Sequence, residues 1–155
     1  MAVQRSVEDQ FWKSAYSATR DSNCRRRTTG AVLILNGQEV LVATNGTPLG
    51  MTRCDQGGCP RCASDIPQLQ GYEDCACVHA EVGLIAQAAR GGIRTDEGSV
   101  YCTLRPCIGC LKVLIEAGIH LVAFSETYEF PPEIETLWKK MANQSGIRTI
   151  DHTRT

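Results

Sequence analysis

Two short stretches of the chain combine side chains that can bind a metal ion and move protons. His79 and Glu81 are two residues apart in CVHAE, and Cys107 and Cys110 bound the tetrapeptide CIGC. An imidazole and two thiolates suit zinc, and three protein ligands leave its fourth position open for water, as in catalytic zinc sites. A carboxylate beside that water can accept and return a proton. The pattern predicts a hydrolytic metal site with His79, Cys107 and Cys110 as ligands and Glu81 as the proton carrier.

Helices are expected to position both stretches. An apolar run at 78–90 ends at two glycines, and Pro106 begins a second run that continues to residue 117. Both motifs therefore fall at helix N-termini, where free N–H groups and the helix dipole favour thiolate over thiol. Residues three apart share a helix face, so the sulfurs of Cys107 and Cys110 can reach one ion. Taken alone, the cysteine pair also suits a redox pair or two buried thiols.

The rest of the chain indicates a sheet with helices on both faces. Residues 28–46 are typical of a hairpin about Asn36-Gly37, a pair that tolerates the positive φ of a type I′ turn. Further strands are expected at SVYCTL, at HLVAFS and, at an edge, at IRTI. Strands that alternate with helices in the later half favour a sheet covered on both faces.

Two more helices are expected to pack on this sheet. Ser6 with Asp9 is typical of the start of the first, which would bury Phe11, Trp12, Ala15 and Ala18. The second follows Pro131-Pro132 and would turn inward Ile134, Leu137, Trp138 and Met141.

Length and charge limit the classes of partner. With 155 residues, 43% of them hydrophobic, the chain is expected to form one domain over 1–155. The 16 Lys and Arg nearly balance the 17 Asp and Glu, which disfavours a nucleic-acid partner. The triplet at 25–27 suits either a solvated turn or contact with a nucleotide phosphate, for which Arg27 is the candidate. Without an apolar leader or spanning run, we expect a soluble, cytoplasmic protein with no membrane partner.

The complete pattern points to a known chemistry. H-x-E followed by P-C-x-x-C is typical of zinc deaminases that act on cytosine or adenine rings. CVHAE with CTLRPCIGC resembles the cytidine deaminase superfamily. Its deoxycytidylate (dCMP) deaminase branch is similar over residues 5–150, through NCRRRTTGAVLI, TNGTP, RCDQGGCPRC, CACVHAE, YCTLRPCIGC, EAGI and ETY.

This resemblance implies a fold and a reaction. The fold is a three-layer α-β-α sandwich with a five-stranded mixed sheet. His79, Cys107 and Cys110 would bind catalytic zinc, which activates water for attack at C4 of the pyrimidine. Glu81 would protonate N3 and then assist the departure of ammonia, converting dCMP to dUMP. Members of the branch are usually homo-oligomers, from dimers to hexamers, so we expect one here.

The resemblance also implies substrate contacts and a second zinc. Asn45 would hydrogen-bond the sugar, although Asn-Gly is also a common turn pair, and Tyr128 would pack on the nucleotide unless it is a rim tyrosine. The expected substrate contacts are Asn45, Thr29, Ala80, Tyr128 and Arg27. The expected ligands of a structural zinc are Cys24, Cys54, Cys59 and Cys75, with Cys62 or Cys77 as substitutes. Reduced, partly buried thiols are the alternative.

Two departures from the branch bear on the substrate. Gly83 stands where an asparagine is usual, and Thr44 stands where a tyrosine is usual. Gly83 removes a side chain near the expected pocket, and we interpret this as room for a bulkier substrate. A free nucleoside or base, an antibiotic or a modified nucleotide is therefore an alternative to dCMP. A zinc-stabilised binding module is the non-catalytic alternative, against which the complete set with Glu81 argues.

Overall fold

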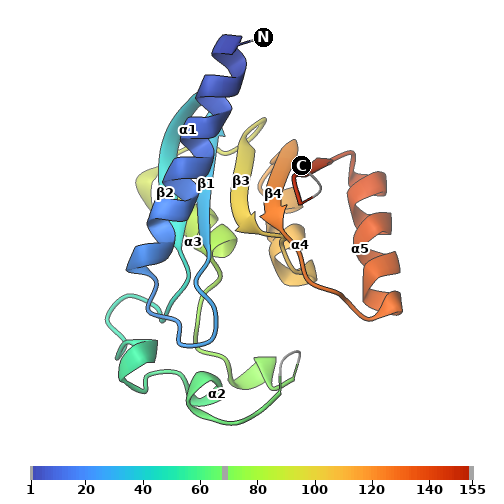
Figure 1. The fold of residues 1–155 in the computed structure, drawn as a ribbon. Helices are drawn as coiled ribbons and strands as arrows, with labels where there is room; N and C mark the ends of the chain where they lie inside the picture. Colours follow the sequence, from blue (N-terminus) through green and yellow to red (C-terminus); the bar gives the residue numbers. More distant parts are fainter. Residues whose placement is uncertain (1, 68–69, 154–155) are drawn as a thin grey trace.

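A five-stranded mixed sheet forms the centre of the molecule (Figure 1). The computed structural model describes residues 2–67 and 70–153. Its strands are β1 (Gly30–Leu35), β2 (Gln38–Thr44), β3 (Ser99–Leu104), β4 (Leu121–Glu126) and β5 (Arg148–Asp151), in the spatial order β2-β1-β3-β4-β5. Strand β1 is antiparallel to both of its neighbours, whereas β3, β4 and β5 are parallel. The expected strands, including the edge strand at IRTI, are confirmed.

The hairpin forms as its turn residues predict. Asn36 and Gly37 have φ values of 51° and 75°, the left-handed region that a type I′ turn requires. Leu33 and Ile34 pair with Leu41 and Glu39, so Val40 is the extra residue of a bulge in β2.

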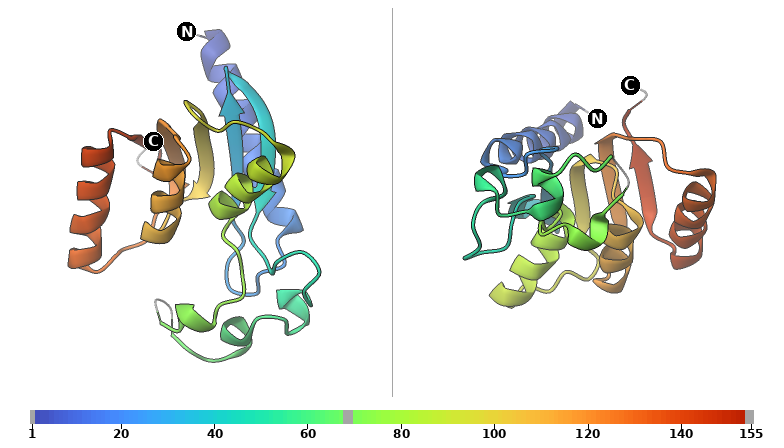
Figure 2. Two further views of the ribbon diagram at one scale, coloured as in Figure 1. Left: turned by 180° about the vertical axis from the view of Figure 1, so that it is seen from behind. Right: turned by 90° about the horizontal axis from the view of Figure 1, so that it is seen from below.

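Four helices cover the two faces of the sheet (Figure 2). They are α1 (Ala2–Ala18), α3 (Ala80–Gly91), α4 (Ile108–Glu116) and α5 (Pro132–Ser145). Helix α1 packs on one face with Val32, Tyr101 and Ala123. Helices α3, α4 and α5 pack on the other, where Leu33 and Val122 are buried. Successive strand residues thus enter opposite apolar layers, as a sheet covered on both faces requires. No described helix has the length and apolar character needed to cross a membrane.

Two helix predictions need correction. Helix α1 begins at Ala2 rather than near Ser6, because no residue between them interrupts a helix. In α5, Trp138 is buried, but Ile134 and Leu137 are 36% and 43% exposed. Only a narrow strip of α5 meets the sheet layer: Trp138 and Ala142, four residues apart, are buried in it, and Met141 packs against it partly buried, as expected.

Helix α1 lies unusually close to β1 at one glycine. A Cβ atom on Gly30 would collide with the backbone carbonyl of Ala15, and the methyl group of Ala18 lies 3.2 Å from the same point. Glycine at position 30 therefore permits the close contact between the helix and the strand.

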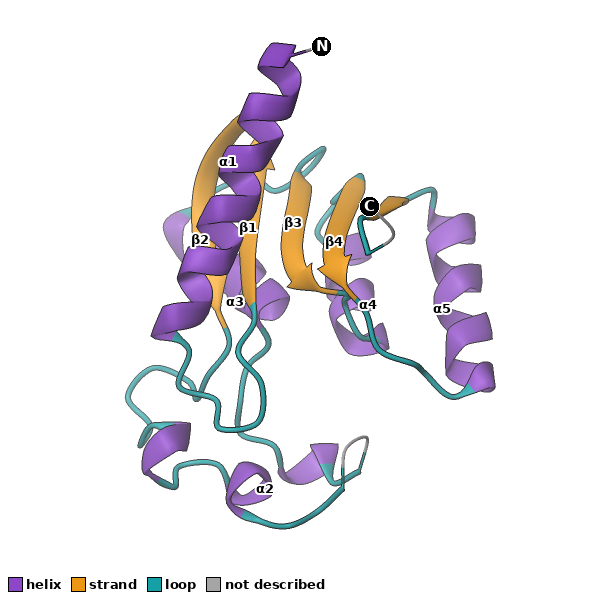
Figure 3. Cartoon of the chain, in the orientation of Figure 1, coloured by secondary structure: helices purple, strands orange, loops and turns teal. Residues whose placement is uncertain are grey.

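A long segment lies beyond the end of the sheet toward which β3 and β4 point (Figure 3). It contains three short helical turns: η2 (Cys54–Gln56), α2 (Pro60–Ala63) and η3 (Tyr72–Asp74). Gly46 and Val78 form an isolated antiparallel bridge through hydrogen bonds of 3.1 and 2.8 Å, so the two ends of the segment meet. We call residues 47–77 the cysteine segment.

Candidate active site and metal-binding cysteines

Two helix starts bring the expected catalytic ligands together. His79 is the N-cap of α3 and Cys107 is the N-cap of α4, both with extended backbone. The two helices pack side by side. The loop before Cys107 is held by α5, because the Trp138 indole N–H donates a hydrogen bond of 2.9 Å to the carbonyl of Pro106.

The three ligand atoms have the spacing of a zinc site. His79 Nδ1 lies 3.2 Å from Cys110 Sγ and 3.5 Å from Cys107 Sγ, and the two sulfurs are 3.5 Å apart. Zn–S bonds of about 2.3 Å and Zn–N bonds of about 2.0 Å at tetrahedral angles give edges of roughly 3.5–3.8 Å. The donor set therefore fits zinc, and its three protein ligands leave a position for water.

Electrostatics favour a thiolate at this site. The hydrogen bond that joins the two sulfurs lowers the pKa of Cys107 to about 4 and raises the pKa of Cys110. The hydrogen bond to Cys107 raises the pKa of His79.

Glu81 lies beside the ligands without joining them. Its side chain contacts Cys110 but is not one of the three clustered donors. The residue is only 6% exposed, and burial raises the pKa of its carboxyl group. A carboxyl group with a raised pKa exchanges protons near neutral pH more readily than an exposed one, as acid–base catalysis requires.

A cavity of about 130 Å³ opens onto this site. Its wall includes Thr29, Asn45, His79, Glu81, Cys107 and Tyr128. The structure thus brings the expected ligands and the proton carrier together with four of the five expected substrate contacts, Thr29, Asn45, Tyr128 and Arg27. Ala80 is not in this wall, because it is buried in the apolar layer beneath α3.

Asn45 connects the cavity to the turn before β1. Its Oδ1 atom accepts hydrogen bonds from Thr29 N at 2.8 Å and from Ser22 Oγ at 2.7 Å. Its Nδ2 atom donates to the carbonyl of Arg27 at 2.7 Å. A carboxamide nitrogen carries two hydrogens, so one donor remains for a ligand in the cavity.

The arginine triplet divides into different roles. The Arg26 guanidinium donates to the carbonyls of Ile66, Arg61 and Ser64 at 2.6–2.9 Å, so it holds the cysteine segment. Arg27 is exposed and lines the cavity, as a phosphate-binding side chain should. Arg25 is exposed outside the cavity wall.

Arg61 and Tyr72 are among the cavity-wall residues that sequence reasoning missed. The Arg61 guanidinium is buried, donates to the carbonyl of Gln70 at 2.8 Å and lies 4.2 Å from the centroid of the Tyr72 ring. Arg61 lies in α2 and Tyr72 in η3, helical turns too short to give a periodic sequence pattern, and only the fold of the cysteine segment carries them to the site.

Tyr128 stands at the rim of the cavity against Phe130. The two ring centroids are 4.4 Å apart in an edge contact. Burial raises the pKa of Tyr128, which keeps its hydroxyl group protonated.

The interpretation of Gly83 was wrong. A Cβ atom at this position would lie 3.7 Å from Ala43 Cβ and 3.9 Å from the carbonyl of Thr44, both ordinary contacts with β2. Gly83 faces β2 and is not among the residues of the cavity wall, so it adds no room to the cavity.

The cysteines expected to hold a structural zinc do not form one group of four ligands. Two groups have sulfurs within 4.8 Å of one another: the first is Cys24, Cys54, Cys62 and Cys77, and the second is Cys59, Cys62, Cys75 and Cys77. The expected ligands therefore divide between the groups, and Cys62 and Cys77, expected only as substitutes, belong to both. Cys102 lies apart, buried in the apolar layer.

Comparison with known proteins places this site in a family. A family model described as the cytidine and deoxycytidylate deaminase zinc-binding region matches residues 5–126. The deoxycytidylate deaminase of Schizosaccharomyces pombe is 32% identical over 132 residues, which make up 85% of this chain and 41% of that protein. ComE operon protein 2 of Bacillus subtilis is 32% identical over 143 residues, or 92% of this chain and 69% of that protein.

A solved structure supports the fold. The dCMP deaminase of cyanophage S-TIM5, in complex with dCMP and dUMP, matches with a TM-score of 0.73 and 24% identity, covering 94% of this chain and 96% of that one. The expected three-layer α-β-α fold is thereby confirmed. The chain spans only 41% of the deoxycytidylate deaminases of Schizosaccharomyces pombe and Saccharomyces cerevisiae, each 32% identical to it. The family model and the Bacillus relative cover most of the chain, which therefore belongs to the cytidine and deoxycytidylate deaminase zinc-binding family.

Proposed function

We propose that this chain hydrolyses the exocyclic amine of a cytosine nucleotide, converting dCMP and water to dUMP and ammonia. The observation that carries the proposal is the clustering of three zinc-type donors with a buried carboxyl group in one cavity. A binding module would have no use for that carboxyl group.

The residues divide the work of the reaction. His79, Cys107 and Cys110 would hold zinc, which when bound lowers the pKa of water and so supplies a nucleophile near neutral pH. Glu81 takes a proton from that water and delivers it to N3 of the ring. After the water oxygen has bonded to C4, the same carboxyl group would carry the remaining proton of that oxygen to the amine, so that the C4–N bond breaks, ammonia leaves and one side chain serves as base and as acid.

The other wall residues suit a nucleotide. The free amide hydrogen of Asn45 can reach a sugar hydroxyl, and Tyr128 offers a ring face or edge to the base. Arg27 is the exposed cation of the wall and would pair with the 5′-phosphate. The relatives named deoxycytidylate deaminase and the phage enzyme solved with dCMP support this choice of substrate.

A substrate panel tests the proposal. The purified chain is incubated with cytosine, cytidine, deoxycytidine, CMP, dCMP, dCTP, guanine and adenosine, and ultraviolet absorbance and ammonia release are followed. The highest kcat/KM is expected for dCMP. Much faster turnover of a free nucleoside or base would reject the nucleotide assignment, and no ammonia from any compound would favour the binding module.

Arg27 provides a sharper test of phosphate recognition. Arg27→Gln should raise KM for dCMP by about 10-fold or more, the value of a charged hydrogen bond, and leave deoxycytidine turnover unchanged. Arg25→Gln, which removes an exposed neighbour outside the wall, is the matched control and should change neither. Equal losses with both substrates would show that Arg27 supports the fold rather than the phosphate.

A further inference from the structure

The cysteine segment has a core made of thiols. Its buried apolar cluster consists of Cys54, Cys59 and Cys62, with Cys24, Cys75, Ala76 and Cys77 packed around them. Such a core offers little apolar area, so another interaction must order the segment.

The thiols lie in two overlapping groups of four. Cys24 and Cys54 belong to the first group only, and Cys59 and Cys75 to the second only. Cys62 and Cys77 belong to both, with every sulfur of a group within 4.8 Å of the others.

We propose that these six thiolates hold two zinc ions, with Cys62 and Cys77 bridging them. Structural zinc is almost always bound by four ligands in a tetrahedron. Two tetrahedra that share one edge require six donors, two of them common to both. The six cysteines match this requirement in number and in membership.

The separations of the sulfurs agree with tetrahedral coordination. Cys24 Sγ lies 3.9 Å from Cys62 Sγ, and Cys59 Sγ lies 3.9 Å from Cys75 Sγ. A tetrahedron with Zn–S bonds of about 2.3 Å has edges of about 3.8 Å. We call the sulfurs that belong to one group only outer. The first separation joins the outer sulfur of Cys24 to the bridging sulfur of Cys62, and the second joins Cys59 and Cys75, the two outer sulfurs of the second group.

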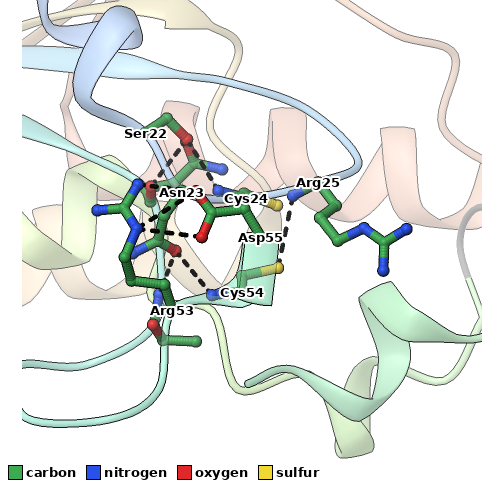
Figure 4. Close-up of polar contacts among 9 residues, drawn as sticks. Ser22, Asn23, Cys24, Arg25, Arg53, Cys54 and Asp55 are labelled. Atoms are coloured by element: carbon green, nitrogen blue, oxygen red, sulfur yellow. Dashed lines mark hydrogen bonds and ion pairs between the residues drawn. The ribbon is translucent and has the colours of Figure 1, made fainter. Parts of the chain in front are cut away.

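The outer sulfurs differ from the bridging ones in the backbone hydrogen bonds that they accept. Backbone N–H groups donate to the outer sulfurs: Arg25 to Cys54 at 3.4 Å (Figure 4) and Ala76 to Cys59 at 3.3 Å. Backbone N–H groups of Arg26 and Arg27 lie beside the Cys24 sulfur, and that of Cys77 lies beside the Cys75 sulfur. An outer thiolate neutralised by one ion benefits from such donors.

The bridging position suits Cys62 for a different reason. Its sulfur contacts thiols of both groups, namely those of Cys24, Cys54 and Cys59. A thiolate shared by two ions has its charge neutralised from both sides. The excess negative charge of the cluster is offset by the buried guanidinium of Arg61, which lies near Cys75.

A single ion would leave two of the six thiols uncoordinated. An ion in the first group would leave Cys59 and Cys75 uncoordinated, and an ion in the second would leave Cys24 and Cys54. Cys54 and Cys59 are each 0% exposed, so either choice would bury at least one free thiol against a negatively charged centre.

The cluster also shapes the cavity. Cys24, Cys62, Cys75 and Cys77 line the same cavity as His79. Two ions would thus fix the wall that carries Arg61 and Tyr72, and the cluster would organise the site without joining its chemistry.

Metal counting tests the proposal. The purified full chain, prepared with zinc and analysed by mass spectrometry against protein concentration, should hold three ions, one at the catalytic donors and two in the cluster. Cys107→Ala should hold two, and the matched control Cys102→Ala, at a buried cysteine outside every group, should hold three. Two ions in the unmodified chain and one in Cys107→Ala would reject the two-ion cluster.

Cadmium-113 NMR on the unmodified chain gives a second test that needs no variant. Two mutually coupled resonances are expected from ions joined by shared sulfur, beside a third that is uncoupled. Three resonances without coupling, or only two resonances, would overturn the bridging arrangement. Because neither measurement uses turnover, an inactive chain with three ions would reject only the proposed function, and an active chain with two ions would reject only the cluster.

Discussion

At the scale of single residues, Glu81 is the side chain on which the proposed reaction depends. It is buried beside Cys110, outside the ligand set, and it is the one carboxyl group among the described residues that line the cavity. A side chain in this position can affect chemistry without affecting metal binding. The two properties can therefore be separated by mutation.

The variant Glu81→Gln keeps the shape of the side chain but cannot carry the proton. We expect kcat to fall by at least about 100-fold, the usual contribution of general acid–base catalysis. The zinc content and the far-ultraviolet circular dichroism should stay unchanged. Glu116→Gln, an exposed glutamate at the end of α4, is the control, and turnover that survives in Glu81→Gln would assign the proton transfer to another group.

Gly83 allows a second test at this scale. Since a Cβ at position 83 meets only ordinary contacts with β2, Gly83→Ala should raise the free energy of unfolding by about 1 kcal/mol through helix propensity. KM for dCMP should not change. Denaturant unfolding and steady-state kinetics check the two expectations, and a raised KM with unchanged stability would return Gly83 to the substrate pocket.

At the scale of elements, α5 supports the start of α4, where Cys107 and Cys110 lie. Besides the bond from Trp138 to Pro106, Glu135 pairs with the Arg105 guanidinium at 2.9 Å. Arg105 is itself 9% exposed and lies 4.0 Å from the centroid of the Trp138 ring. Helix α5 thus anchors Arg105 and Pro106, the two residues that precede the proposed ligand Cys107.

The ion pair predicts a pH dependence of stability. The hydrogen bond from Arg105 lowers the pKa of Glu135, so the folded chain binds this proton less readily than the unfolded chain. The stabilisation is present above the unfolded pKa of about 4.5 and is lost as pH falls through the lower folded pKa. Glu135→Gln should therefore unfold more easily at pH 7 by about 1 kcal/mol, and the difference should disappear in acid.

Glu133→Gln is the matched control for this pair. Glu133 is also in the first turn of α5, so both variants lose the same favourable interaction with the helix dipole. Urea unfolding of the three proteins from neutral to acid pH makes the comparison. A difference between the two variants that persists in acid would contradict the assignment to the ion pair.

At the scale of the whole molecule, the layers and the catalytic donors were predictable, whereas the organisation of the cysteine segment was not. Local patterns determine the hairpin at Asn36-Gly37 and the helix starts at His79 and Cys107, because turn chemistry and capping act within a few residues. The pairing of cysteines depends on how an irregular segment of about 30 residues folds back on itself. No periodicity encodes that path, so the division into two groups and the positions of Arg26 and Arg61 emerged only from the structure.

The close approach of α1 to the sheet gives a test of the layered architecture. Gly30→Ala should lower the free energy of unfolding by about 2 kcal/mol, since the added methyl group would collide with the carbonyl of Ala15 and push the helix outward. Gly91→Ala, where the nearest atom would be a flexible Ile93 side chain at 3.6 Å, is the control and should be nearly neutral. Thermal denaturation of both variants measures the difference, and equal stability would mean that α1 can shift without cost.

The bridge between Gly46 and Val78 has a consequence for how proteins of this architecture can diversify. Because Gly46 and Val78 pair with each other, the cysteine segment between them begins and ends at the same place and forms a closed loop. A loop of this kind can be lengthened, shortened or exchanged while Asn45 and His79, which flank its paired ends, keep their positions. Selectivity for new ligands can therefore evolve in this loop while the cluster of His79, Cys107 and Cys110 keeps its geometry.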